Sequence, residues 1–173
     1  MKRKLLFIVV ILVSIVMVTY LVVGRKSQPL PKDLQEQLIH SASFEALSLN
    51  PEPILNSDKL STNSDTLLRY PILGHVRIDD QNLRQELVNA VSKDIANANH
   101  LPTQCVLEPR HGIRCIDGSN SMLVAICYHC GDVVLSRNGK DEGYLIKMDK
   151  SLPDSKKLFQ KIFQTAGFKS DVK

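Results

Sequence analysis

A run of 19 residues without a charged side chain is the feature that most constrains this chain. Residues 5–23 read LLFIVVILVSIVMVTYLVV. At ~1.5 Å per residue, a helix of this length spans about the ~30 Å hydrocarbon core of a bilayer. A cleaved signal peptide usually has a shorter apolar core, ~7–15 residues, that ends in small residues, and YLVVGRKS offers neither feature. We therefore predict an uncleaved transmembrane helix over 5–23, through which the protein contacts the membrane.

Basic residues on both sides of this run bear on its orientation. Three Lys and Arg residues lie within residues 1–4, and two more follow the run directly. Three cations and the terminal amine on so short a head favour a cytoplasmic head under the positive-inside rule. The sequence thus predicts a single-pass membrane protein with residues 1–4 in the cytoplasm. The body of the chain would lie in the periplasm or at the cell surface.

The charge of the exported part excludes one class of partner. The chain has 22 Lys and Arg residues against 18 Asp and Glu, a formal net charge of +4. Without the five basic residues beside the apolar run, 17 bases face 18 acids in residues 27–173. Aromatic residues make up only 5% of the chain. This part lacks the electrostatic footprint of a nucleic-acid-binding protein, so we predict no nucleic-acid partner.

The rest of the chain predicts one domain over residues 41–168, with a frayed tail at 169–173. Residues 24–40 combine two prolines with a short helical pattern, which suits a juxtamembrane spacer better than a core element. SFEALSLNP alternates apolar and polar residues and predicts a strand, and YPILGHVRI predicts a second strand at 70–78.

A helix is predicted directly after the second strand. Asp79 and Asp80 can cap its N-terminus and oppose the positive end of its dipole. Arg84 and Asp94 fall on other faces than the apolar stripe, as in an amphipathic helix packed on a sheet. The stripe consists of Leu83, Leu87, Val88, Val91 and Ile95.

Further along the chain, the period of the pattern changes from 3.6 to 2. GIRCI, SMLVAICY, DVVLSR and GYLIKM are each bounded by turn residues, which predicts an antiparallel meander. Asn138-Gly139 favours a tight hairpin that pairs 132–137 with 143–148. A last helix begins at Ser151 and Pro153 and ends at Gly167. The predicted fold class is α+β: an N-terminal transmembrane helix followed by one domain with an antiparallel β-meander packed against two helices.

All four cysteines fall within 26 residues of the predicted meander, at Cys105, Cys115, Cys127 and Cys130. In an oxidising compartment an even number of cysteines predicts disulfides, and three pairings are open. The alternative is a structural zinc site. Cys127 and Cys130 have the spacing of a zinc knuckle, but the gap between the other two cysteines does not. The remaining ligands would come from those two, His111 and His129, so zinc is a candidate cofactor.

A catalytic dithiol is a third interpretation of ICYHCGDVV. Such a site usually places its first cysteine at a helix N-terminus, where the dipole and free amides lower the pKa of the thiol. Here the residues after Cys130 have strand character. On a regular strand, Cys127 also shares a face with Leu123 and Ala125. We therefore predict that CYHC closes a sheet corner as a structural element and does not exchange thiols catalytically.

EPRHGIR, at 108–114, suggests a separate anion-binding site. Arg110, His111 and Arg114 would converge on an anion if the segment from Pro109 to Gly112 formed a rigid loop. The alternative is a turn that leads into a strand, with an arginine on the wet face and a locally hydrogen-bonded histidine. The residues alone leave both open.

Four segments, taken in order, resemble an uncharacterised family of bacterial membrane-anchored or secreted proteins. They are SFEALSLNP, YPILGHVRI, PRHGIR and ICYHC, and the resemblance covers roughly residues 42–137. The family pattern has a Cys before Pro-Arg-His and a Cys-x-x-Cys that ends a strand. This chain departs from it in the wider gap between Cys105 and Pro109 and in the additional Cys115. The resemblance implies the domain boundaries and an exported bacterial origin, and it implies no activity.

Three common enzyme motifs do not occur in the sequence. They are the G-x-S-x-G motif of serine hydrolases, the H-E-x-x-H motif of metalloproteases and the phosphate-cradling glycine loop of nucleotide-binding enzymes. We therefore predict a membrane-anchored extracytoplasmic binding or interaction domain whose partner is an unidentified protein or small molecule. The alternative is a Cys/His-dependent enzyme, either metal-assisted or thiol-based.

Overall fold

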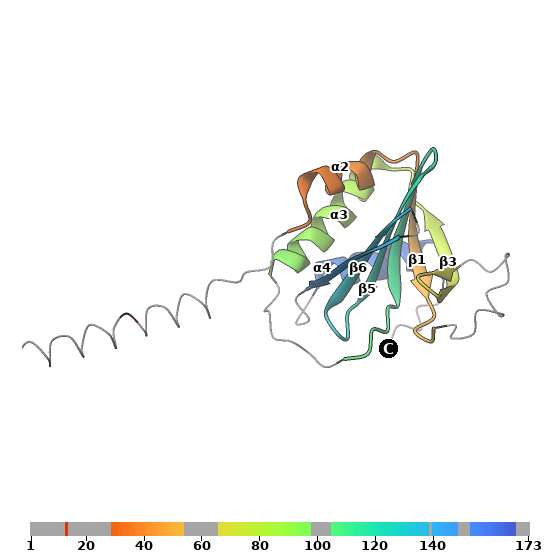
Figure 1. The fold of residues 1–173 in the computed structure, drawn as a ribbon. Helices are drawn as coiled ribbons and strands as arrows, with labels where there is room; N and C mark the ends of the chain where they lie inside the picture. The colour runs from red at the N-terminus through yellow and green to blue at the C-terminus, as the bar shows by residue number, and fades with distance from the viewer. Residues whose placement is uncertain are drawn as a thin grey trace, which may run out of the picture.

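The computed structural model describes residues 13, 29–53, 66–97, 105–138, 140–148 and 153–168. Within these ranges the chain forms an α+β fold with a curled antiparallel sheet (Figure 1). The helices are α2 (Lys32–His40), α3 (Gln81–Ala96) and α4 (Asp154–Thr165). The strands are β1 (Ser43–Leu49), β2 (Thr66–Leu67), β3 (Tyr70–Arg77), β4 (His111–Asp117), β5 (Asn120–Cys127), β6 (Asp132–Arg137) and β7 (Lys140–Lys147).

The strand order is β2-β3-β1-β4-β5-β6-β7, and every neighbouring pair is antiparallel. Six strands make the main sheet, and the two-residue β2 extends it beside the start of β3. Strands β4 to β7 follow one another in space as in sequence. This arrangement confirms the predicted meander, including the hairpin in which 132–137 pairs with the strand that follows Asn138. Gly139, the second residue of that turn, lies outside the described residues.

The three helices cover one face of the sheet (Figure 1). Alternate strand residues point toward them because successive side chains of a strand face opposite ways. α3 lies between α2 and α4 and contacts both. The resulting core joins buried side chains of all three helices to strand residues that include Phe44, Ala46, Ile113, Val124, Ile126 and Val133.

The other face of the sheet carries a second, smaller apolar cluster around Leu47, Leu49, Leu67, Tyr70 and Ala125. Gly112 lies beneath it on β4. A Cβ at this position would come within 2.7 Å of the Leu67 side chain and 2.9 Å of a carbonyl oxygen of β5. The close approach of the β2 turn to the sheet therefore requires glycine at 112.

The structure corrects the prediction of a spacer over residues 24–40. Residues 32–40 form α2, in which Leu34, Leu38 and Ile39 are buried in the main core, and Leu30 before it is buried as well. The sheet is thus covered by three helices, where two were expected. Only three apolar positions in the nine-residue helix produce this packing, so the apolar pattern indicates a core helix only weakly, and the two prolines before it favour a spacer.

The predicted membrane helix (5–23), head (1–4) and tail (169–173) lie outside the described residues, apart from Val13. The helices that the structure does describe are all too short or too polar to cross a bilayer.

Arg84 departs from its predicted place on an outer face of the second helix. Its side chain is 6% exposed, and its guanidinium group lies 5.6 Å from the centre of the Phe44 ring. Its Nε donates to the carbonyl oxygen of Ile78 at 2.7 Å. Its Nη1 donates to the carbonyl oxygens of Ser41 at 2.7 Å and Ile39 at 3.3 Å. A single buried cation therefore satisfies main-chain groups from three segments of the chain.

We expect the substitution Arg84→Met to lower the free energy of unfolding by about 2–4 kcal/mol, because it leaves three buried carbonyl oxygens without this donor. Arg77→Met is the matched control, since Arg77 is largely exposed and pairs with Asp79 at the surface. The control should change stability by about 0.5 kcal/mol or less. Urea unfolding measures both variants, and equal losses would contradict the role assigned to Arg84.

Candidate functional site

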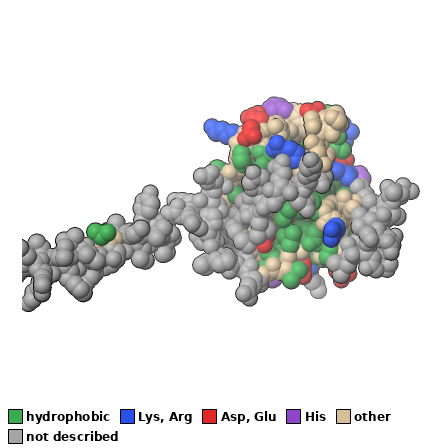
Figure 2. All heavy atoms as spheres, viewed as in Figure 1, with side chains coloured by type: hydrophobic (Ala, Val, Ile, Leu, Met, Phe, Trp, Pro, Cys, Tyr) green, Lys and Arg blue, Asp and Glu red, His purple; other side chains and the backbone are tan. Residues whose placement is uncertain are grey.

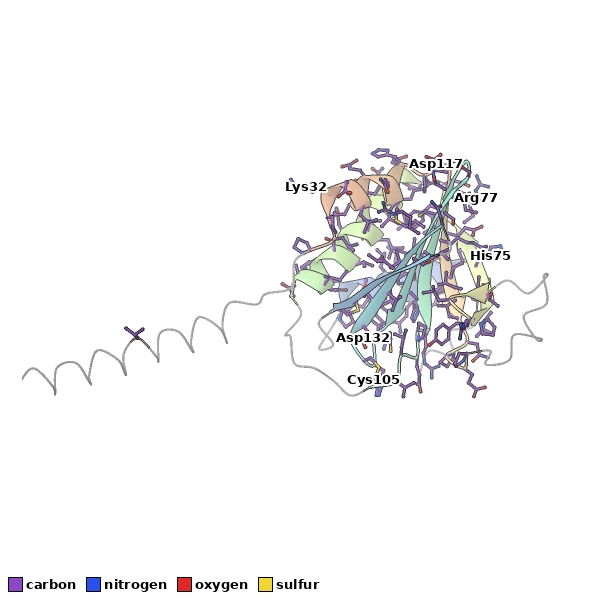
Figure 3. All side chains as sticks on the ribbon, viewed as in Figure 1. Lys32, His75, Arg77, Cys105, Asp117 and Asp132 are labelled. Atoms are coloured by element: carbon purple, nitrogen blue, oxygen red, sulfur yellow. A yellow bond between two sulfur atoms is a disulfide. The ribbon has the colours of Figure 1, made fainter. Side chains whose placement is uncertain are left out.

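The cysteine cluster is resolved into one disulfide and two separate thiols. Cys105 and Cys130 form a disulfide with their Cα atoms 5.7 Å apart. The bond joins the segment before β4 to the turn between β5 and β6, at the lower end of the sheet in Figure 3. The long-range disulfide belongs to one of the three pairings that the sequence left open, but the second bond of that pairing is not formed, because Cys115 and Cys127 are both thiols. Its partner within CYHC is Cys130, while Cys127 remains a thiol.

Cys115 and Cys127 are both buried, but they lie on opposite faces of the sheet. Cys115 pairs with Phe44 and Met122 in the register and belongs to the helix-covered core. Cys127 shares the opposite face with Ala125, as the strand alternation predicted. His129 is exposed in the turn. In the described part of the chain, no three His, Cys, Asp or Glu side chains come together as metal ligands would.

Tyr128, the second residue of CYHC, connects the turn to the helix layer. Its hydroxyl lies 2.8 Å from Oγ of Ser155, at the start of α4. Ser155 in turn donates to the Asp94 carboxylate at 2.6 Å, so Tyr128 is the donor to Ser155. Asp94 also accepts hydrogen bonds from the backbone amides of Asp154 and Ser155. A network of three side chains, of which Ser155 and Asp94 are buried and Tyr128 is partly buried, thus joins the β5–β6 turn, α3 and α4.

His111 is a buried core residue. It is 1% exposed and lies among Tyr128, Phe159 and Phe163, with ring centroids 5.2, 5.1 and 6.2 Å away. Its Nδ1 has no hydrogen-bond partner among the described residues. Burial, and then the positive charges of Lys156 and Arg110, lower the pKa of His111 to about 4. The ring is therefore neutral at physiological pH and packs as an aromatic side chain.

We expect His111 to make stability depend on pH between 4 and 6.5. In this range the unfolded histidine binds a proton that the folded one does not, so stability falls as pH decreases through the window. The loss should approach about 3 kcal/mol near pH 4. Unfolding should be measured at several pH values for the native chain, His111→Phe and the exposed-site control His75→Gln. Only His111→Phe should lose this pH dependence. A native-like pH profile of stability in that variant would refute the role assigned to His111.

The three residues of the suggested anion site do not converge. His111 and Arg114 are three apart on β4 and therefore point to opposite faces. Arg110 is exposed before the strand. Arg114 lies on the other face, where its Nε contacts Glu45 at 2.7 Å. The strand begins at His111, so the strand of the alternative is present, but its locally hydrogen-bonded histidine is not, because Nδ1 of His111 has no partner among the described residues.

A cavity of about 520 Å³ lies at the opposite end of the sheet from the disulfide. It is formed by the end of α2, the β4–β5 hairpin and the end of β6. Figure 3 shows Asp117 at this upper end and Cys105 at the lower end. In Figure 2, acidic, basic and histidine side chains gather over α2 at the top of the domain. The lining includes Glu36, Gln37, His40, Ser41, Cys115, Asp117, Asn120, Met122 and Arg137.

The lining of this cavity is chemically mixed. Met122 and Cys115 come from the apolar core and supply a buried floor. Nε2 of His40 lies 3.1 Å from Glu36, and its Nδ1 lies 2.9 Å from the Gln81 side chain. Burial raises the pKa of the Cys115 thiol to about 12, and its Sγ lies 3.6 Å from the Leu38 carbonyl oxygen. The thiol is therefore protonated and is no nucleophile near neutral pH.

Sequence patterns do not predict this cavity, because its residues come from three strands and from α2, whose short helical pattern beside two prolines also suits a spacer. The only signal was the density of polar residues in the segment DGSN at the β4–β5 turn. Comparison with protein-family models, curated proteins and solved structures finds no match to this chain.

Proposed function

We propose that this chain is a membrane-tethered, extracytoplasmic binding domain whose ligand occupies the cavity between α2 and the β4–β5 hairpin. The observation that carries the proposal is the combination of charges of both signs with an apolar floor in one cavity of about 520 Å³. Cavities of ~300–1,000 Å³ with few polar groups around apolar walls are typical of small-molecule sites.

The charges suggest a ligand that carries both an amine and a carboxylate, such as an amino acid or a short peptide. Glu36 on α2 and Asp117 at the β4–β5 hairpin supply carboxylates at the rim of the cavity, and carboxylates suit an ammonium group. Arg137 supplies a guanidinium, which suits a carboxylate. Met122 offers apolar surface for the side chain of such a ligand. The amides of Gln37 and Asn120 add neutral hydrogen-bonding groups.

The cavity favours binding over catalysis. Its one thiol, on Cys115, is protonated at neutral pH because burial raises its pKa. The buried His111 and the Cys127 thiol both lie at the far end of β4 and β5, but on opposite faces of the sheet. A Cys/His-dependent enzyme would need a reactive thiol beside a histidine, and the one thiol that shares the cavity with His40 is protonated, so the binding hypothesis fits the geometry better.

Binding can be tested with three matched compounds: L-leucine, isopentylamine and 4-methylpentanoate, followed by a panel of L-amino acids and dipeptides. We expect compounds with both charges to raise Tm, and the two single-charge analogues to bind at least about tenfold more weakly. Asp117→Asn and Arg137→Gln should each weaken binding about tenfold or more, as measured by calorimetry.

Lys161→Gln is the control variant for this experiment. Lys161 lies in a different hollow, of about 450 Å³, between α3 and α4. It should leave the affinity unchanged. The proposal fails if no compound with both charges binds, or if the control weakens binding as much as the cavity variants do.

The tether is supported by the uncharged run at 5–23 and by the basic residues around it. An alkaline phosphatase fused after Lys173 is expected to be active, because that enzyme folds only where disulfides form. A cytoplasmic reporter at the same position is the matched control and should be inactive. The reverse pattern would overturn both the orientation and the oxidising compartment.

A further inference from the structure

Cys105, Cys127 and Cys130 meet at the corner between β5 and β6, and Cys127 takes no part in a disulfide. The backbone amide of Cys130 donates to Sγ of Cys127 at 3.3 Å. Cys130 is itself joined to Cys105. A free thiol therefore lies against the residue whose sulfur forms the disulfide. Cys115, the other thiol, lies on the opposite face of the sheet and is remote from this corner.

We propose that Cys127 is an internal nucleophile that rearranges the disulfide from Cys105–Cys130 to Cys127–Cys130. The Cys127 thiolate attacks Sγ of Cys130, and a new sulfur–sulfur bond forms as the Cys105–Cys130 bond breaks. Cys105 leaves as a thiolate. Cys127 gives a proton to solvent and Cys105 takes one up, so one disulfide replaces another and no oxidant or reductant is consumed.

The turn geometry permits the second pairing. Residues 128–131 form a turn in which the amide of Gly131 donates to the carbonyl oxygen of Cys127 at 2.8 Å. A hydrogen bond between residues four apart closes a single helical turn, in which Cα atoms three residues apart lie about 5 Å from each other, inside the usual range of a disulfide. Gly131 has a φ of +69°, a conformation that glycine adopts without strain and that closes the turn.

The burial of the corner indicates how the exchange is controlled. Cys127 and Cys130 are both 0% exposed, so attack requires local opening of the turn. Opening is also opposed by the Tyr70 hydroxyl, which donates to the Leu107 carbonyl oxygen at 2.7 Å. This bond holds the segment that carries Cys105.

Exchange would change what the segment before β4 is attached to. In the observed state the disulfide crosslinks residues 25 apart in sequence. After exchange the crosslink is confined to one turn, and the half-buried Cys105 becomes a free thiol at the lower end of the sheet. The exchange would thus detach the segment before β4 from the β5–β6 turn, at the end of the sheet opposite the proposed ligand cavity. This proposal does not rest on the proposed function.

Trypsin cleavage distinguishes the two states. Cys105 lies in the peptide 94–110, whereas the other three cysteines lie in the peptide 115–137. The observed disulfide therefore links two peptides, and the rearranged one is internal to the second. The full chain, isolated at pH 6, should be incubated at pH 7 and pH 8, acid-quenched, alkylated under denaturing conditions, digested and analysed by mass spectrometry.

We expect the linked peptides to disappear while Cys105 becomes alkylated, and to disappear faster at pH 8 than at pH 7, because the attacking species in disulfide exchange is the thiolate. The rate should not depend on protein concentration. Cys127→Ser should keep the linked peptides throughout, and Cys115→Ser, the matched control, should exchange like the native chain.

Three results would overturn the proposal. One is a native chain that keeps the Cys105–Cys130 link at pH 8 while Cys127 reacts with the alkylating agent. Another is loss of the link in Cys127→Ser at the native rate. The third is a rate that rises with protein concentration, which would mean that the attacking thiol belongs to another molecule.

Discussion

The buried guanidinium of Arg84 is the interaction on which the arrangement of the other elements depends. It binds carbonyl oxygens at the end of α2, before β1 and after β3. The last carbonyls of a helix have no partner within it and carry partial negative charge, so a cation suits the end of α2. Ser41 assists, because its hydroxyl bonds the Leu38 carbonyl oxygen at 2.9 Å. The position of α2, and with it one wall of the cavity, thus depends on a residue that does not line the cavity.

The other polar anchor lies further along the same helix. Asp94 of α3 is 5% exposed and accepts the first amides of α4, which begins after Pro153 and has no side-chain cap of its own. A carboxylate near a helix N-terminus also opposes the helix dipole. The middle helix therefore carries a cation for α2 and an anion for α4. Each charge is buried because another element supplies its partner, which makes the three-helix layer a cooperative unit.

Sequence patterns predicted the elements far better than the polar anchors that join them. Strand alternation located β1, β3 and the meander, and Asp80 caps α3 as expected, accepting from the amide of Asn82 at 2.8 Å. Arg84 and Asp94 were placed on outer faces because periodicity sorts residues by polarity alone. Whether a charge can be buried depends on partners remote in sequence, and the Ser41 carbonyl is 43 positions from Arg84. Nothing in a local window reports such a partner.

The cysteine corner shows the same limit. Strand parity correctly placed Cys127 on the face of Ala125, but the long-range partner of Cys130 depends on how the segment before β4 crosses the sheet end. Within the turn, nearby residues are attached to different parts of the fold. Tyr128 is hydrogen-bonded to Ser155 of α4, and Cys130 is crosslinked to Cys105 in the segment before β4. Because these attachments hold the turn from both faces, the corner is a fixed structural joint in the observed state. Thiol chemistry at Cys127 therefore requires the joint to open first, which separates it from an exposed catalytic dithiol at a helix terminus.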